Sequence, residues 1–138
     1  MLFRTRLYEK KEKRLVRFPR GLCLENFRIP DGVKSIGEYA FVYAKKLNDV
    51  TLNINGVDIG EGAFSYCESL SEVKNFNGVK NVDAYAFAYT AITSADLSGA
   101  ITIGDRVFMK DTLTPFSVIL GNSLMSLGDN PFAMCILA

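Results

Sequence analysis

The chain of 138 residues contains no histidine and no tryptophan. Without histidine, neither a Ser-His-Asp triad nor a Cys-His pair can form, and no histidine-ligated metal site can exist. The three cysteines (Cys23, Cys67 and Cys135) are an odd number and have no CxxC spacing. This disfavours a disulfide framework and excludes a zinc site built from four cysteines of this chain. We therefore expect no catalytic activity and no cofactor.

Long apolar runs and extreme compositions are also missing. Four prolines, eleven glycines and a 49% hydrophobic fraction do not fit a disordered or collagen-like chain. The longest uncharged run, residues 112–128, is interrupted by polar residues, glycine and proline, so it does not predict a membrane span. Charges directly follow Met1-Leu2-Phe3, so no signal peptide is visible. The chain is therefore either cytoplasmic or a part or mature form of a longer protein.

The net charge of +1 conceals an uneven distribution. Residues 1–20 carry eight basic and two acidic side chains, whereas the remainder is net acidic. Two short apolar stretches, around Leu7-Tyr8 and Leu15-Val16, flank the charged residues 9–13, which is typical of a hairpin. We interpret residues 1–22 as a basic N-terminal hairpin or cap. No basic helix or aromatic-rich strand motif accompanies these charges, so we expect no nucleic-acid partner.

An internal repeat dominates the rest of the chain, residues 23–138. A pattern of aliphatic residue, Gly, acid, one residue, Ala and Phe begins at Ile36 and returns four times. Its phenylalanines are spaced 23, 23, 21 and 24 residues apart. The chain therefore contains five repeats, which are marked by Phe41, Phe64, Phe87, Phe108 and Phe132.

Each repeat has about five apolar residues and cannot bury them alone, so the repeats must stack like on like. The predicted fold is a β-solenoid, with one short parallel strand per coil and a tight turn or short 3₁₀ helix at the Gly-acid segment. Gly37, Gly60, Gly104 and Gly128 would give that turn its backbone freedom. The alternating pattern aligns Leu113-x-x-Phe116 with Ile92-x-x-Ala95. The predicted ladder positions are Ile36, Phe41, Leu47, Ile59, Phe64, Leu70, Val82, Phe87, Ile92, Ile103, Phe108, Leu113, Leu127 and Phe132.

The runs from Ile29 to Phe41 and from Ala63 to Cys67 resemble the BspA-type (Treponema pallidum-type) leucine-rich repeat, whose unit is about 23 residues. The resemblance implies a right-handed leucine-rich-repeat superhelix. It also implies a non-catalytic adhesin or binder of host extracellular or surface proteins, located at the bacterial cell surface or secreted.

Two rows of residues are candidates for a site. Tyr43, Tyr66 and Tyr89 lie two places after successive repeat phenylalanines. They either form an exposed aromatic stripe suited to protein or glycan recognition, or cover the outer edge of the core. The acids after the glycines (Glu38, Glu61, Asp105 and Asp129) could either line up to hold a hard cation or face the N-termini of their turns.

The cysteines and the C-terminal end complete the predictions. Cys67 and Cys135 share a repeat position three coils apart, too far for a disulfide, and are expected to act as small buried apolar residues. Residues 136–138 lead into a next strand without a polar cap. The solenoid therefore either continues in a longer parent or is covered by a second chain, as a homo-oligomer. A structural self-assembling element or an intracellular scaffold are the alternatives to a surface binder.

Overall fold

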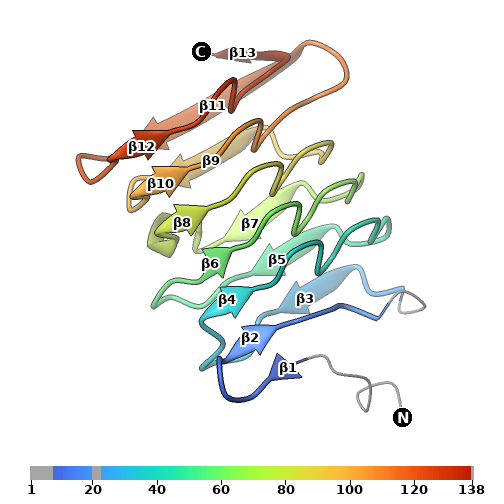
Figure 1. The fold of residues 1–138 in the computed structure, drawn as a ribbon. Helices are drawn as coiled ribbons and strands as arrows, with labels where there is room; N and C mark the ends of the chain where they lie inside the picture. The colour runs from blue at the N-terminus through green and yellow to red at the C-terminus, as the bar shows by residue number, and fades with distance from the viewer. Residues whose placement is uncertain (1–7, 20–22, 138) are drawn as a thin grey trace.

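The computed structural model describes residues 8–19 and 23–137, which wind as a β-solenoid of about five turns (Figure 1). One seven-stranded sheet runs the length of the solenoid, with its strands in the spatial order β1-β2-β4-β6-β8-β10-β12. These strands are β1 (Tyr8–Glu9), β2 (Arg14–Leu15), β4 (Ser35–Ile36), β6 (Asp58–Ile59), β8 (Asn81–Val82), β10 (Thr102–Ile103) and β12 (Ser126–Leu127).

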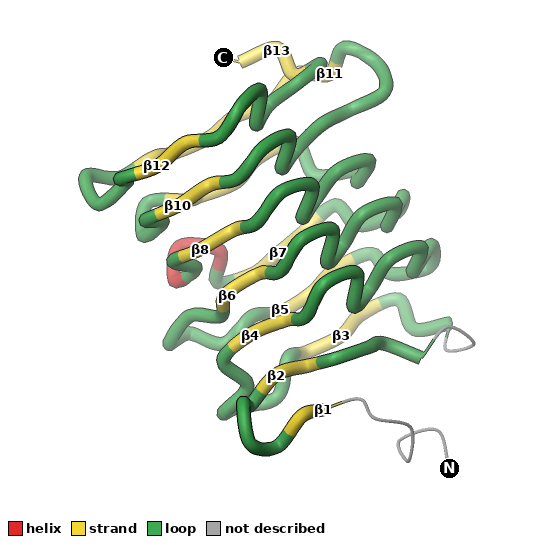
Figure 2. The backbone as a smooth tube through the Cα atoms, in the orientation of Figure 1, coloured by secondary structure: helices red, strands yellow, loops and turns green. Residues whose placement is uncertain are grey.

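Two three-stranded sheets form the opposite wall, with the orders β3-β5-β7 and β13-β11-β9. Their strands are β3 (Asn26–Arg28), β5 (Asp49–Thr51), β7 (Glu72–Lys74), β9 (Ser94–Leu97), β11 (Thr114–Leu120) and β13 (Cys135–Leu137). The 3₁₀ helix η2 (Phe76–Gly78) follows β7, where the first of these sheets gives way to the second. Turns make up most of the rest of the described chain (Figure 2).

The pairing of neighbouring strands is parallel throughout the solenoid, as stacked coils require. The antiparallel pair is β1 with β2, in which Tyr8 lies opposite Leu15. Because β2 also pairs in parallel with β4, the first rung of the solenoid already lies within the basic N-terminal segment. The hairpin therefore joins the long sheet directly, and its β2 strand serves both structures.

The core is built from ladders of like residues on successive coils. Rings of neighbouring phenylalanines stack from Phe41 to Phe132, with centroids 4.6 to 5.8 Å apart and planes within 15° of each other. Phe18 adds a sixth ring, 4.9 Å from Phe41. Offset stacking at such distances is favourable beyond the apolar area that it buries. The aliphatic ladder of the long sheet is also fully buried and consists of Leu15, Ile36, Ile59, Val82 and Ile103.

The predicted pairing in the last coils is wrong by two residues. Ala95 pairs with Val118, not with Phe116. The reason is the longer turn after Phe108, since ten residues separate Phe108 from Val118 whereas eight separate Phe87 from Ala95. Leu113 falls in that extra length and is 66% exposed, so it is not a core ladder residue. Phe116 is buried instead, 5.0 Å from the Phe108 ring.

The ladders are less buried at the C-terminal end of the described chain. Leu127 pairs with Ile103 in the neighbouring strand but is 50% exposed, and Phe132 is only partly buried. Both residues contact one neighbouring coil, whereas the equivalent residues of the central coils are covered from two sides. Their partial exposure is the physical consequence of lying in the outermost coil.

Candidate functional site

The turn that follows each repeat phenylalanine places the predicted tyrosines on the surface. The backbone of Tyr43, Tyr66 and Tyr89 is left-handed, with φ of 60° to 61°. Each backbone N–H donates to a carbonyl of the next coil, at 3.1 Å for Tyr43 to Ser65, 3.0 Å for Tyr66 to Ala88 and 2.8 Å for Tyr89 to Met109. These bonds between coils fix the turns, because the left-handed region is costly for a residue with a side chain.

The structure brings the three side chains together into one stacked row, which we call the tyrosine row (Tyr43, Tyr66 and Tyr89). The ring centroids are 4.9 Å apart for Tyr43–Tyr66 and 4.6 Å for Tyr66–Tyr89, with 17° between planes in both pairs. Tyr43 is 54% exposed and Tyr66 37%, and Tyr89 is half-buried. The tyrosine row is therefore a partly exposed stack of aromatic side chains on the surface.

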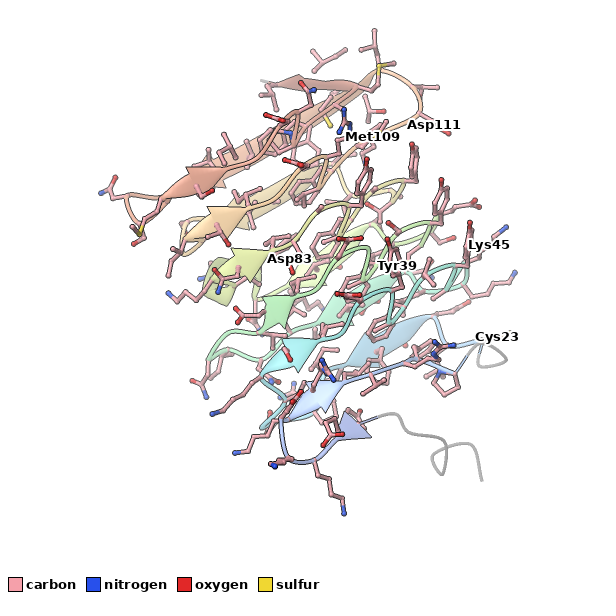
Figure 3. All side chains as sticks on the ribbon, in the orientation of Figure 1. Cys23, Tyr39, Lys45, Asp83, Met109 and Asp111 are labelled. Carbon is pink, nitrogen blue, oxygen red and sulfur yellow. The ribbon has the colours of Figure 1, made fainter. Side chains whose placement is uncertain are left out.

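The environment of the tyrosine row changes the ionisation of its central member. Desolvation raises the pKa of the Tyr66 phenol, and the neighbouring Tyr89 and Tyr43 act in the same direction. The two ends of the row are hydrogen-bonded to Lys45 and Met109, which are labelled in Figure 3. The Lys45 N–H donates to the Tyr43 carbonyl at 2.8 Å, and the Tyr89 N–H donates to the Met109 carbonyl at 2.8 Å. Tyr89 ends the row with a long contact from its hydroxyl to Met109 Sδ at 3.5 Å.

A second pair of tyrosines lies nearer the long sheet. Tyr39 and Tyr85 also have left-handed backbones, but Gly62 occupies the equivalent position in the coil between them. The Tyr39 ring lies over Gly62, and its hydroxyl donates to Glu61 Oε2 at 2.9 Å (Figure 3). This contact raises the pKa of Tyr39, mainly through the hydrogen bond to Glu61 and the charge of that carboxylate. These two tyrosines therefore do not form a continuous row.

In the coil that follows Tyr89, Lys110 occupies the repeat position of the three tyrosines. Its side chain is buried, which we did not predict from the sequence. Its ammonium donates to the carbonyl oxygens of Thr90 at 2.6 Å and Ile92 at 2.7 Å. Burial lowers the pKa of Lys110, partly offset by the Cys135 and Asp111 side chains. The altered spacing after Phe108 is the one sign in the sequence that this coil is irregular. The spacing alone does not show that the Lys110 side chain is the one that is buried.

The two repeat cysteines are hydrogen-bond donors as well as small apolar residues. Cys67 Sγ donates to the Phe41 carbonyl at 3.0 Å and Cys135 Sγ to the Phe108 carbonyl at 3.3 Å. Cys67 is fully buried and Cys135 partly buried. Desolvation raises the pKa of Cys67 to about 12, against a smaller lowering by a backbone hydrogen bond. Burial and the raised pKa therefore disfavour the reactive thiolate form of Cys67 at neutral pH.

Two of the acids that follow the repeat glycines, Glu61 and Asp105, accept hydrogen bonds within the fold. Glu61 accepts the hydrogen bond from Tyr39, and Asp105 Oδ1 accepts one from the backbone N–H of Asp129 at 2.7 Å. Partial burial, and then the charges of Asp58, Glu61 and Glu38, raise the pKa of Asp83. Within residues 8–19 and 23–137, no group of three or more His, Cys, Asp or Glu side chains could hold a metal ion. In the same residues no helix is long and apolar enough to cross a membrane.

The stacked coils, parallel ladders and repeated turn define a leucine-rich-repeat solenoid. The chain belongs to the family of BspA-type leucine-rich repeat regions, whose model matches residues 17–138 in six copies. This confirms the resemblance seen in the sequence. The family model finds six copies, one more than the five repeats that we counted from residue 23. The matched region begins at residue 17 and so includes Phe18, whose ring stacks on that of Phe41.

Solved structures of bacterial leucine-rich-repeat proteins share the fold. The Treponema pallidum leucine-rich repeat protein superposes with a TM-score of 0.70 at 21% identity, over 87% of this chain and 58% of that one. The pneumococcal vaccine antigen PcpA gives 0.68 at 20% identity, over 88% and 32%. A leucine-rich repeat protein from Eubacterium ventriosum gives 0.61 at 21% identity, over 75% and 27%. This chain thus spans less than two thirds of each of them, and no curated protein matches it.

Proposed function

We propose that this chain is a non-catalytic protein-binding module, and that its partner binds at the tyrosine row. The observation that carries the proposal is the row itself, with three partly exposed aromatic rings held at fixed spacing by hydrogen bonds between coils. Tyrosine contributes a large contact area at a low cost in conformational entropy, and a rigid scaffold lowers that cost further. The mechanism is recognition over an extended surface, without chemistry.

The partner we propose is a host extracellular or surface protein, and the location is the bacterial cell surface or the secreted fraction. Membership of the BspA-type family supports this, as do the structural neighbours, among them a pneumococcal vaccine antigen. Immunolabelling of intact cells tests the location, because a cytoplasmic scaffold would be labelled only after lysis. We propose no nucleic-acid partner, since no basic helix or aromatic-rich strand motif accompanies the basic residues of the sequence.

Binding to an array of purified extracellular-matrix proteins tests the proposal. The variant with Tyr43, Tyr66 and Tyr89 all changed to serine is expected to lose at least tenfold in affinity, since aromatic side chains dominate interface energies. The matched control changes Tyr39 and Tyr85 to serine, which removes exposed tyrosines outside the row. Equal binding by the triple variant and the parent chain would overturn the role of the tyrosine row.

A second candidate function, self-assembly, is favoured by the apolar end of the solenoid. Met125 is 85% exposed, and Leu127, Ile136 and Leu137 are also exposed there. A homo-oligomer formed through this end would cover these side chains and pair the outer edges of the last strands. Sedimentation velocity over a hundredfold concentration range tests it, with Leu127→Glu as the disrupting variant. A single monomeric species at all concentrations would rule out this candidate.

A further inference from the structure

The tyrosine row presents its edges, and not its faces, to a partner. Tyr66 is stacked on both sides, at 4.9 Å from Tyr43 and 4.6 Å from Tyr89, so both of its ring faces are occupied. Sugars and nucleic-acid bases bind aromatic side chains by stacking on an open face. The inner part of the row therefore offers no platform for these ligands. What it offers is the exposed part of each stacked ring, with a phenol hydroxyl on each side chain.

The hydroxyls of the tyrosine row are available to hydrogen-bond to a partner. Within the described part of the chain, the hydroxyls of Tyr43 and Tyr66 make no hydrogen bond, and that of Tyr89 has only the 3.5 Å contact to a thioether. A phenol hydroxyl both donates and accepts, but a partner made of carbonyl groups uses its donor. The charges beside the row are mixed, since Lys45 and Glu68 are exposed at equivalent positions of successive coils. A neutral partner rich in unpaired carbonyls fits this surface.

The distance between the first and last rings of the tyrosine row limits which peptide conformation can match it. Two steps of 4.9 and 4.6 Å place the Tyr43 and Tyr89 rings about 9.5 Å apart along the solenoid. A polyproline II helix repeats every three residues, about 9.3 Å, and its carbonyls make no internal hydrogen bonds. An extended strand repeats on one face about every 6.7 Å, and an α-helix has a pitch of about 5.4 Å with its carbonyls already bonded. Over these three coils, the polyproline II repeat matches the row and the other two do not.

We propose that the segment recognised by the tyrosine row is a neutral, proline-rich polyproline II helix that lies along the solenoid axis. Prolines three residues apart contact Tyr43 and Tyr89, and the hydroxyl of Tyr66 donates to a carbonyl between them. The helix is already ordered in the free peptide, so little conformational entropy is lost on binding. This inference rests on the proposed function, because it specifies the partner of the same surface.

Titration of the full chain with a decaproline peptide, followed by amide chemical shifts, tests the proposal. The control peptide is a Gly-Ser decamer, which has the same length and neutral charge but no preformed helix. We expect saturable binding of decaproline alone, with the largest shifts around residues 43, 66 and 89. Tyr66→Phe, which keeps the stacked ring, should weaken binding about three- to tenfold by removing one hydroxyl donor. Tyr66→Ser should weaken it more, and Tyr85→Ser should leave it unchanged within twofold.

The outcomes separate this inference from the proposed function. If decaproline does not bind, but an extracellular protein is still bound in a tyrosine-dependent manner, the inference is wrong and the proposed function stands. If decaproline binds Tyr66→Ser as well as the parent chain, the inference is also wrong. If neither ligand depends on the row, both proposals fail. Thermal unfolding of each variant ensures that a loss of binding is not a loss of folding, and Tyr66→Phe provides the conservative comparison.

Discussion

Gly60 lies directly against the backbone of Ile36 in the preceding coil. Its N–H donates to the Ile36 carbonyl at 2.8 Å, and a Cβ added to Gly60 would lie 2.7 Å from that same oxygen. The φ of Gly60 is not positive, so the glycine is required for close approach and not for its conformational freedom. The restriction is local to this coil, because Asp83 occupies the equivalent position in the next coil and its N–H donates to the Ile59 carbonyl at 2.9 Å.

We therefore expect Gly60→Ala to destabilise the solenoid by about 2–3 kcal/mol, because the clash is with a backbone atom that cannot move independently. The matched control is Gly37→Ala, where the equivalent contact to the Leu15 carbonyl would be 3.2 Å. That change should cost less than about 1 kcal/mol, since smaller adjustments suffice. Urea denaturation of both variants measures the difference. Equal free energies of unfolding would contradict the role of coil spacing.

The phenylalanine stack predicts a gradient of stability from the centre to the end. Phe87 is fully buried between Phe64 and Phe108, so Phe87→Ala should lower the free energy of unfolding by about 3–5 kcal/mol. Phe132 is partly buried and stacks on Phe108 from one side only. Phe132→Ala is expected to cost less than half as much. The same denaturation assay compares the two, and a larger loss at Phe132 would be inconsistent with the observed burial.

The regular part of the fold could be predicted because each coil has to bury apolar residues at the same repeat positions. The phenylalanine and aliphatic ladders follow from placing like residues on like, and the coils from Phe41 to Phe108 obey this closely. The pairing of β9 with β11 could not be predicted, because a periodic pattern does not show where two additional residues are accommodated. Leu113 looks like a ladder residue in the sequence only because the insertion precedes the strand.

The candidate site was predictable in position but not in conformation. Spacing placed Tyr43, Tyr66 and Tyr89 at one repeat position, whereas the left-handed backbone of all three has no signature in the sequence, since tyrosine does not favour that region. The prediction had assigned backbone freedom to the glycines that precede the turn. The hydrogen bonds between coils impose the positive φ six residues later instead, and these contacts exist only in the stacked structure.

Burial of Cys67 predicts a large difference in thiol reactivity between the cysteines. The pKa of Cys67 is raised to about 12 and its side chain is inaccessible, whereas Cys23 is exposed. With a disulfide reagent at pH 8, Cys23 should react at once and Cys67 only at the rate allowed by unfolding. Cys67→Ala identifies the slow phase by removing it. Modification of Cys67 as fast as that of Cys23, without denaturant, would contradict the buried position.

Lys110 predicts a dependence of stability on pH that can be assigned to one side chain. Burial lowers its pKa in the folded state, so between that value and about 10.4 the unfolded chain binds more protons than the folded chain. The contribution of Lys110 to stability is therefore complete above the unfolded pKa, and it is lost as the pH falls through the folded pKa. Stability should consequently rise with pH across this window.

Lys110→Met tests this dependence, because it keeps an apolar stem of similar length but removes the ammonium. The variant should lose the pH-dependent rise relative to the parent chain, and comparing the two cancels the opposite effect of the raised pKa of Cys67. At pH 7 it should also be less stable by about 1–3 kcal/mol, because the carbonyls of Thr90 and Ile92 lose their donor. Lys45→Met, at an exposed position, is the control and should change neither quantity. Parallel pH profiles of unfolding for Lys110→Met and the parent chain would show that the ammonium is not buried in solution.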